Sequence, residues 1–342
     1  MRLALKRTFV AQLLALLIAF PSPSWGWGNS GHEAVAYIAW QQLTPETRVR
    51  VIALLKQVPT LHSPTGKVVP GYAEWQADLP AGLSEDDKNL YIFMRAATWP
   101  DTIKHVGFED SDTAPGTDSD VNIGYSDPKS HGYWHFVDAG FTSDHSKVPA
   151  TPIPNAATEI VALRAAVSSG ESDDLESYDL VWIEHLVGDV HQPLHGTVRY
   201  FANKGDEGGN TVVVKLTPAM KRTFEGTLSR TPPTELHAFW DDLPGEGNPA
   251  DALPQAAAFA KALPQAADNK VADTDPSDWA VESFKMAKTD AYASPIKAAP
   301  KPATGSGYVM TQAYYNKAMR DAQGRIALAG ARLAKLLNEN LK

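Results

Sequence analysis

Leu180–His195 reads LVWIEHLVGDVHQPLH, and this stretch determines how we expect the rest of the chain to fold. Its first part is apolar on all sides, which predicts a helix buried in a protein core. His185 and Asp189 interrupt the apolar run at positions i and i+4, so their side chains lie one turn apart on the same side of the helix. Pro193 should end the helix, and His195 follows in the next turn. Three metal-type donors therefore come from one buried segment.

His237 and Asp241 repeat this spacing, because LHAFWD at 236–241 again places a histidine and an aspartate four residues apart among apolar neighbours. One such pair alone is more often a local salt bridge than a metal site. Two pairs favour metal binding, since a buried carboxylate without a cation is costly. The chain contains no cysteine, which excludes disulfides and thiolate ligands, so a metal would have to be held by His, Asp, Glu or main-chain atoms.

Hydrophobic periodicity and helix-boundary residues predict a mainly α protein, a single helical domain with one short β-hairpin. The 342 residues, 43% of them hydrophobic, can form one sizeable core, and no repeat or change of composition marks a second domain. Helices are expected over 32–43, 45–58, from 84 toward 99, 155–169, 180–192, 234–241, 252–263, 279–292 and 310–341. A strand is expected over 211–216, paired in the hairpin, and loops over 60–83, 107–130 and 196–209.

The first 26 residues have the pattern of a secretory signal peptide. Basic residues precede an apolar run over 9–20, and small residues stand at −3 and −1 of a cleavage site before Trp27. The run of about 12 apolar residues is too short for the ~20 that span a bilayer, and no later segment is long and apolar enough. We therefore expect no membrane span, a secreted or periplasmic location after loss of residues 1–26, and a mature domain over 27–342.

The chain is acidic, with a formal net charge of −9. Loss of residues 1–26 removes Arg2, Lys6 and Arg7 and no acidic residue, which takes the net charge to −12. A protein that holds nucleic acid through many Lys and Arg contacts to phosphates should instead be basic. If this protein acts on nucleic acid, metal ions and contacts to the bases must supply the binding.

Six short motifs follow one another along the chain: WGNSGH at 27–32, WPD at 99–101, WHFVD at 134–138, HLVGDVHQPLH at 185–195, GGN at 208–210 and LHAFWD at 236–241. In this order they resemble the secreted zinc-dependent nucleases of the S1/P1 family, and the resemblance covers essentially the whole mature chain. It implies that family's helical fold, which is related to that of zinc-dependent phospholipase C. Plant and fungal members carry disulfides that this chain cannot form, and the chain looks like a bacterial member.

The resemblance implies three zinc ions per chain and assigns nine ligand residues. Asp101, His135, His185 and Asp189 would hold the first zinc, and Asp189 would bridge to the second. His32 and the amine and carbonyl of Trp27 would complete the second site. His195, His237 and Asp241 would hold the third. A donor set of imidazoles and carboxylates also suits zinc on chemical grounds, although other divalent ions use the same donors.

Four further residues match positions that handle substrate in the family. Lys104, one turn after Asp101, matches a basic residue that neutralises the phosphate in the transition state. Phe136 and Asp138 match an aromatic that stacks on a nucleobase and a carboxylate that hydrogen-bonds it, and Asn210 is expected in the same pocket. Without the resemblance, Lys104 can be a solvated lysine, Phe136 a core residue, Asp101 a turn residue and His135 a strand histidine.

The implied activity is hydrolysis of single-stranded RNA and DNA to 5′-phosphorylated products, together with dephosphorylation of 3′-nucleotides. Asp101, Lys104 and Asp189 would be the catalytic residues, acting with a water activated between two zinc ions. These nucleic acids and nucleotides are the only binding partners that the resemblance implies. No stable protein partner is implied, and we expect a monomer.

Two other functions are compatible with the donor set. A zinc-dependent phospholipase C would use a similar three-metal site, but Phe136, Asp138 and Asn210 suit a base better than a lipid headgroup. A periplasmic zinc-storage protein would explain the ligands and leave Lys104 and the base-pocket residues without a role. The loops over 107–130 and 196–209 look longer than in plant and fungal relatives and should border the cleft. Of all the properties that the resemblance implies, substrate preference is therefore the one least expected to be shared with those relatives.

Overall fold

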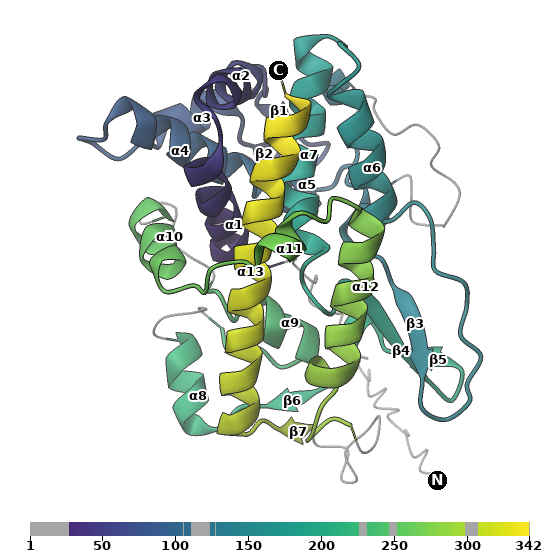
Figure 1. Cartoon of the computed structure of the whole chain (residues 1–342). Coiled ribbons are helices and arrows are strands. Elements are labelled where there is room, and N and C mark those ends of the chain that lie inside the picture. Colours follow the sequence, from purple (N-terminus) through teal and green to yellow (C-terminus); the bar gives the residue numbers. More distant parts are fainter. Residues whose placement is uncertain are drawn as a thin grey trace, which may run out of the picture.

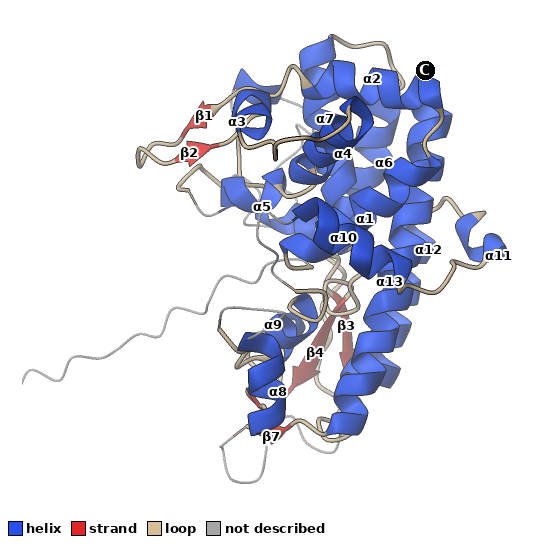
Figure 2. Cartoon of the chain, turned by 90° about the vertical axis from the view of Figure 1, so that its left-hand side faces the viewer, coloured by secondary structure: helices blue, strands red, loops and turns tan. Residues whose placement is uncertain are grey.

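The computed structural model describes residues 27–104, 106–110, 124–126, 128–225, 231–245, 252–297 and 307–341, and helices dominate it, as the sequence predicts (Figures 1 and 2). The α-helices are α1 (Asn29–Gln42), α2 (Pro45–Leu55), α3 (Tyr72–Ala77), α4 (Glu85–Ala96), α5 (Trp99–Lys104), α6 (Ala156–Ala166), α7 (Asp173–Asp189), α8 (Pro218–Thr223), α9 (Leu236–Asp241), α10 (Ala252–Lys261), α11 (Asp268–Val271), α12 (Pro276–Met286) and α13 (Gln312–Asn340). Shorter helical turns are η1 (Gly124–Ser126), η2 (Gly132–His135), η3 (Glu207–Gly209) and η6 (Ala287–Ala291). The expected signal peptide and residues 111–123 of the expected 107–130 loop lie outside the described residues.

Helix α7 is surrounded by other helices and contains the stretch on which the fold prediction rests. α1, α2, α5, α6 and α13 all pack against it, and every residue from Glu176 to Asp189 is buried. α13, drawn in yellow in Figure 1, runs along α1 and also contacts α7. The buried helix predicted over 180–192 is therefore confirmed, although it begins earlier, at Asp173, and ends at Asp189.

Side-chain caps fix the starts of several helices at residues that the sequence marks. Oγ1 of Thr44 accepts a hydrogen bond from the N–H of Thr47 at the start of α2. Ser84, Asn155 and Thr311 cap α4, α6 and α13 in the same way. Each bond satisfies an N–H that has no partner within its own helix, so these boundaries can be recognised from local sequence.

The strands of the described residues are short and form three small sheets. These are β1 (Leu61–His62) with β2 (Val68–Val69), β3 (Ala139–Thr142) with β4 (Thr197–Phe201) and β5 (Lys204–Gly205), and β6 (Val214–Lys215) with β7 (Tyr308–Val309). β3 is parallel to β4, and β4 is antiparallel to β5. Figure 2 shows β3 and β4 below most of the helices, beside the lower part of α13.

The expected hairpin over 211–216 is wrong. β6 lies in that segment, but it pairs in parallel with β7, about a hundred residues further along the chain. A hairpin occurs instead between β4 and β5, inside the expected 196–209 loop, and its turn is formed by Ala202 (φ 49°) and Asn203 (φ 59°). Alternation of residue types can identify a strand but not the strand with which it pairs. The short hairpin β4–β5 is not predicted because its sequence is polar and rich in glycine, which is typical of a loop.

The expected loop over 60–83 also contains short regular elements, namely β1, β2 and α3. Helix α3 begins after Gly71, whose N–H donates to Oε2 of Glu74 at 2.9 Å. Six residues are too few to show a helical period, so local hydrogen bonding rather than an apolar stripe defines this helix.

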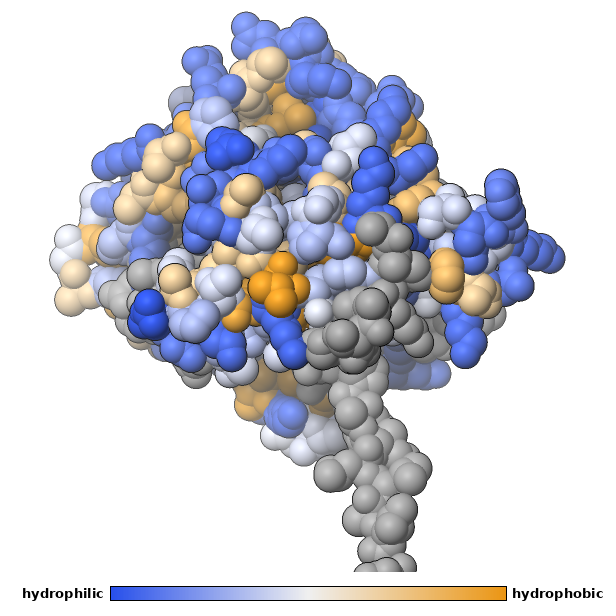
Figure 3. Space-filling view, turned by 90° about the horizontal axis from the view of Figure 1, so that it is seen from below, coloured by the Kyte–Doolittle hydropathy of each residue, from blue (hydrophilic) through white to orange (hydrophobic). Residues whose placement is uncertain are grey.

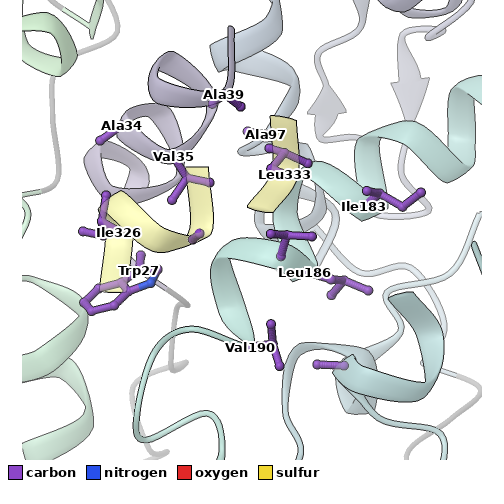
Figure 4. Close-up of a cluster of buried hydrophobic side chains, with 14 of the residues drawn as sticks. Trp27, Ala34, Val35, Ala39, Ala97, Ile183, Leu186, Val190, Ile326 and Leu333 are labelled. Atoms are coloured by element: carbon purple, nitrogen blue, oxygen red, sulfur yellow. The ribbon is translucent and has the colours of Figure 1, made fainter. Parts of the chain in front are cut away.

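Buried side chains from both ends of the described chain form a single hydrophobic cluster, which extends from Trp27 to Leu341. Figure 4 shows Trp27 beside Ile326 of α13, with Val35 of α1 close by. The surface seen in Figure 3 is mostly hydrophilic, with small separate hydrophobic patches. Among the described helices, none has both the length and the apolar character needed to cross a bilayer.

Candidate metal centre

Within the part of the chain that the structure describes, buried histidine and aspartate side chains form three groups whose donor atoms converge. Within each group, one donor atom from every residue lies within 4.8 Å of the others. The groups are Asp101 with His135 and His185, His32 with His185 and Asp189, and His195 with His237 and Asp241. All of the side-chain ligands expected from the sequence are therefore brought together, from α1, α5, η2, α7, the turn after α7, and α9.

Asp189 faces the first two groups with different carboxylate oxygens. Its Oδ2 lies 2.9 Å from Nδ1 of His135 and 3.1 Å from Nε2 of His185. Its Oδ1 lies 3.5 Å from Nε2 of His32 and 3.5 Å from Nδ1 of His195. The i,i+4 spacing of His185 and Asp189 thus brings both side chains to one point, as the sequence predicts.

The third group is built by the turn after α7 and by α9. Nε2 of His237 lies 3.5 Å from Oδ2 of Asp241, and Nε2 of His195 lies 3.8 Å from Oδ1 of the same carboxylate. The turn η3 supports His237 through the carbonyl of Gly208, 2.8 Å from Nδ1. Gly208 has a φ of 60°, and a Cβ there would lie 2.7 Å from the carbonyl oxygen of Leu194, so this approach requires glycine.

Three of the histidines are oriented so that one ring nitrogen remains for a metal. Nδ1 of His185 lies 2.8 Å from the carbonyl oxygen of Ala97, and Nδ1 of His195 lies 2.7 Å from that of His135. His237 makes the equivalent contact with Gly208. Because a carbonyl only accepts, each Nδ1 carries a proton, and the neutral form of each ring then has its lone pair on Nε2. Imidazole ligands of zinc are held in this way, so these residues fit the metal.

Several donor atoms of the groups have no hydrogen-bond partner within the described part of the chain. They include both ring nitrogens of His32, Nε2 of His195 and of His237, Oδ1 of Asp189 and Oδ2 of Asp241. Buried polar atoms are normally satisfied, so unsatisfied atoms that face one another need an explanation. A cation between them would supply the shared partner.

Burial is the main cause of the pKa shifts of Asp241 and His237 in the third group. Burial raises the pKa of Asp241 well above its ordinary value. Burial, followed by the charge of His195, lowers the pKa of His237 well below its ordinary value. Without a cation, Asp241 would take up a proton and His237 would lose one. A bound divalent ion would reverse the cost of the carboxylate charge and would suit the neutral imidazole.

Asp101 stays ionised because a cationic side chain is close to it. Nζ of Lys104 lies 3.0 Å from Oδ1 of Asp101, one turn earlier on α5. Burial opposes ionisation, but the charges of Lys104, His185 and His135 together hold the pKa of Asp101 below its usual range. The first group therefore combines a carboxylate with imidazoles, which is a donor set suited to zinc.

Trp27 and His32 lie at the start of the described chain and pack against the ends of α7 and α9. A Cβ on Gly188 would lie 2.7 Å from Nδ1 of His32, so the glycine leaves room for the imidazole. The N–H of Gly28 donates to the carbonyl of Asp241 at 2.9 Å, which holds this segment beside α9. The indole of Trp27 is fully buried, whereas its expected ligand atoms belong to the main chain.

Phe136 and Lys104 lie together at the edge of the third group. The ring of Phe136 is centred 4.6 Å from the ring of His195 and 6.0 Å from that of His237. Nζ of Lys104 lies 5.7 Å from the centre of the same phenyl ring. Phe136 is partly exposed, unlike the buried ligands, so it is not a core residue. An aromatic face and an ammonium group are thus adjacent beside the donor groups.

Asp138 and Asn210 occupy the segments next to Phe136 and η3. The N–H of Asp138 lies 3.5 Å from the carbonyl oxygen of His195, and Nδ2 of Asn210 donates to the carbonyl of Glu207 at 2.8 Å. Burial, together with the charges of Asp206 and Glu207, raises the pKa of Asp138 to about 7. Asp138 can therefore be either a hydrogen-bond donor or an ionised acceptor near neutral pH.

Gln192 is a buried residue of this centre that the motifs do not identify. Its Nε2 donates to Oδ1 of Asp241 at 2.6 Å, and its Oε1 accepts from the N–H of Leu194. An amide is a poor zinc ligand, so a search for metal donors passes over it. Its position in an apolar stretch could have identified it, because a buried amide requires hydrogen-bond partners nearby.

Comparison with known proteins gives one family and two named relatives. A model of the S1/P1 nuclease family matches residues 27–342. The chain is 26% identical to Endonuclease 2 of Arabidopsis thaliana, in an alignment that covers 96% of each protein. It is also 25% identical to Nuclease S1 of Aspergillus oryzae, over 73% of this chain and 65% of that protein. The family match includes every segment that contributes to the three groups.

Proposed function

The chain belongs to the S1/P1 nuclease family, and on that premise we propose that it is a three-zinc phosphodiesterase of single-stranded RNA and DNA. Family membership makes it a nuclease, a hydrolase that breaks phosphodiester bonds in nucleic acids. The finer proposal is that it leaves 5′-phosphorylated products and also removes the phosphate of 3′-nucleotides. The catalytic domain would be formed by residues 27–342.

The observation that carries the three-zinc proposal is the division of the Asp189 carboxylate between two donor groups, with a third group beside it. Asp101, His135, His185 and Asp189 would hold one zinc. Asp189, His32 and the amine and carbonyl of Trp27 would hold the second, and His195, His237 and Asp241 the third. Zinc bound in this way supplies a Lewis acid that lowers the pKa of water and stabilises negative charge on oxygen.

Lys104 is proposed to stabilise the negative charge that grows on the phosphate during the reaction. Its ammonium group is 3.0 Å from Asp101 and 5.7 Å from the centre of the Phe136 ring, so it lies between the donor groups and the aromatic face. A cation fixed where charge develops acts without further reorganisation. This role explains why a lysine lies beside a donor set of histidines and aspartates. A protein that only stored zinc would not need a lysine there.

The proposed preference for single strands rests on Phe136 and Asp138. A base can stack on an aromatic ring and present its edge to a carboxylate only when it has left the duplex stack. Phe136 is partly exposed beside the third group, and Asp138 follows two residues later. Asn210, which ends η3, would contribute to the same base pocket. These contacts need few basic residues, in agreement with the acidic chain.

We further propose that residues 1–26 direct export and are removed, so that the mature protein acts as a monomer outside the cytoplasm. The support is the basic and apolar pattern of this segment and the match of the family model from Trp27 onward. Loss of the segment would also free the amine of Trp27 for metal binding.

The activity of the purified mature protein tests this function. We expect cleavage of single-stranded DNA and RNA and dephosphorylation of 3′-AMP, little cleavage of duplex DNA, and loss of all three activities in a chelator with recovery on addition of zinc. Cleavage of phosphatidylcholine without nucleotide hydrolysis would indicate a phospholipase C instead. Lys104→Met should lower kcat with the zinc content unchanged. The exposed Lys56→Met is the matched control and should have no effect.

A further inference from the structure

The sheet β3–β4–β5 begins directly after Asp138 and has one face turned away from the core. On the core side, Phe141 contacts the rings of Phe284 and Tyr292, and Arg199 lies over Tyr292. Strand alternation therefore places Tyr200 on the opposite face. The sheet is joined directly to Asp138, because β3 starts at the next residue, Ala139.

The ring of Tyr200 lies across all three strands. Tyr200 pairs with Thr142 of β3 on one side and with Gly205 of β5 on the other. A Cβ on Gly140 would lie 3.1 Å from Cε2 of Tyr200, and a Cβ on Gly205 would lie 3.4 Å from Cε1. A Cβ on Gly140 would also overlap with Cγ1 of Val148, so the loop after β3 covers part of this face beside the ring. Glycines on both neighbouring strands leave room for Val148 and for the ring of Tyr200. The side chain is half-buried, so part of it remains open to solvent.

The backbone around Tyr200 is held in place by side-chain hydrogen bonds from the loop that follows β3. The carboxylate of Asp144 accepts from the N–H of Ala202 at 2.8 Å and from the N–H of Ser146 at 3.0 Å. Oδ1 of Asn203 accepts from the N–H of Lys147 at 3.0 Å. The β4–β5 turn is therefore tied to the loop, and the ring is fixed before any ligand binds, which reduces the entropy cost of stacking.

Tyr200 is also near the acidic side chains of the expected base pocket. Burial, followed by the negative charges of Asp138 and Asp206, raises the pKa of the Tyr200 hydroxyl above its ordinary value. Asp206 directly precedes η3, and its carbonyl accepts a hydrogen bond from the N–H of Gly209 at 3.0 Å. The register of the sheet places Tyr200 near both segments of the expected base pocket: its partner Thr142 is four residues after Asp138, and its partner Gly205 is two residues before η3.

We propose that Tyr200 is a second base-stacking platform, which receives the nucleotide next to the one held by Phe136 and Asp138 in a single-stranded substrate. An aromatic ring lying on a sheet is the arrangement by which several nucleic-acid-binding domains stack bases. The carboxylates nearby would repel phosphates, so the contact is to the base and not to the backbone. The inference rests on the proposed function and extends it from a single nucleotide to a strand.

A purely structural role for Tyr200 makes a different prediction. Aromatic side chains also stabilise sheets by covering glycines on adjacent strands, and Gly140 and Gly205 are such positions. Tyr200→Leu keeps an apolar side chain over these glycines and removes the aromatic ring. Tyr200→Ala removes both. If the ring stacks on a base, both variants should lose binding of a strand, whereas a structural role would be largely preserved in Tyr200→Leu.

The test compares a short single-stranded oligodeoxyadenylate with 3′-AMP as substrates of the zinc-loaded enzyme. Tyr200→Leu should raise KM for the oligonucleotide about 5- to 150-fold, the range for one stacked base, with kcat unchanged. KM for 3′-AMP should not change, because that substrate has no second base. Phe136→Ala should raise KM for both substrates. Phe201→Ala, the adjacent exposed aromatic on β4, is the matched control and should affect neither.

The possible outcomes separate this inference from the proposed function. Wild-type protein that cleaves neither substrate would overturn the proposed function. Wild-type activity on both substrates, with an unchanged oligonucleotide KM in Tyr200→Leu and Tyr200→Ala, would overturn the second platform alone. An equal rise in KM for the oligonucleotide and for 3′-AMP would also overturn it, because the change would then act on the first pocket.

Discussion

Nε2 of Gln192 donates a hydrogen bond to Oδ1 of Asp241 at 2.6 Å, which leaves Oδ2 of Asp241 facing Nε2 of His237 at 3.5 Å. The amide cannot rotate freely, since its own oxygen accepts from the N–H of Leu194. Oδ1 of Asp241 thus has a hydrogen-bond donor, whereas Oδ2 has none among the described residues. We therefore expect Gln192 to act as a positioning residue for the third group, although its amide offers a metal no ligand of its own.

Gln192→Met should weaken the third zinc site about 10- to 100-fold, the usual effect of removing a hydrogen bond to a metal ligand. Competition with a zinc chelator should remove one zinc from the variant at a concentration that leaves all three in the wild type. The exposed Gln42→Met is the control. Equal retention of zinc by Gln192→Met and the wild type would show that Asp241 is oriented by packing alone.

Asp189→Asn should be the most damaging single change among the ligands. The variant keeps the volume of the side chain but loses the charge between two donor groups, so we expect kcat/KM to fall by about 1,000-fold or more, which corresponds to about 4 kcal/mol. Zinc content should fall by more than one ion per chain. Near wild-type rates in Asp189→Asn, in an experiment where His237→Ala is inactive, would refute the bridging role.

The raised pKa of Asp138 predicts a pH dependence of substrate binding. Its pKa is about 7 in the folded protein and is higher than the ordinary value because of burial and the charges of Asp206 and Glu207. The folded state therefore favours the protonated carboxyl. This stabilising effect is fully present at acidic pH and is lost as the pH rises through about 7.

Binding of a base amino group to Asp138 should become stronger as the pH rises, because the ionised carboxylate is the better hydrogen-bond acceptor. We expect KM for 3′-AMP to decrease as the pH rises from 6 to 8 in the wild type. The same measurement on Asp138→Asn, which does not titrate, separates this effect from protonation of the zinc ligands. A pH profile of KM that is identical in the two proteins would remove Asp138 from base recognition.

The amine of Trp27 should contribute to activity only after the residues before it are removed. An α-amine has a reference pKa of about 7.7 to 8.0, so zinc can displace its proton near neutral pH, whereas an amide nitrogen is a poor ligand. Protein that retains a methionine ahead of Trp27 should hold one zinc fewer and lose most of its activity, and precise removal of the extra residue should restore both. Equal zinc content and equal rates in the two forms would leave Trp27 as a packing residue.

The sequence predicts the long helices and the two His/Asp pairs because both depend on local spacing, whereas the grouping of Asp101, His135 and His32 with them is implied only by the family resemblance. The buried run around His185 and Asp189 identifies α7, and capping residues such as Thr44 mark helix starts. The partner of 211–216 could not be predicted, since its pairing with β7 depends on how distant segments pack. Gln192 and Tyr200 could not be identified for a related reason: their roles come from contacts with Asp241 and with glycines on other strands.

The zinc content of the mature protein tests the central claim most directly. The protein should be purified with its chain beginning at Trp27, dialysed against zinc-free buffer and measured by elemental analysis, with X-ray anomalous scattering from crystals to locate each ion. We predict three zinc ions per chain, one at each group formed by His32, Asp101, His135, His185, Asp189, His195, His237 and Asp241. At most one tightly bound metal per chain, with nuclease activity that survives chelation, would contradict the account.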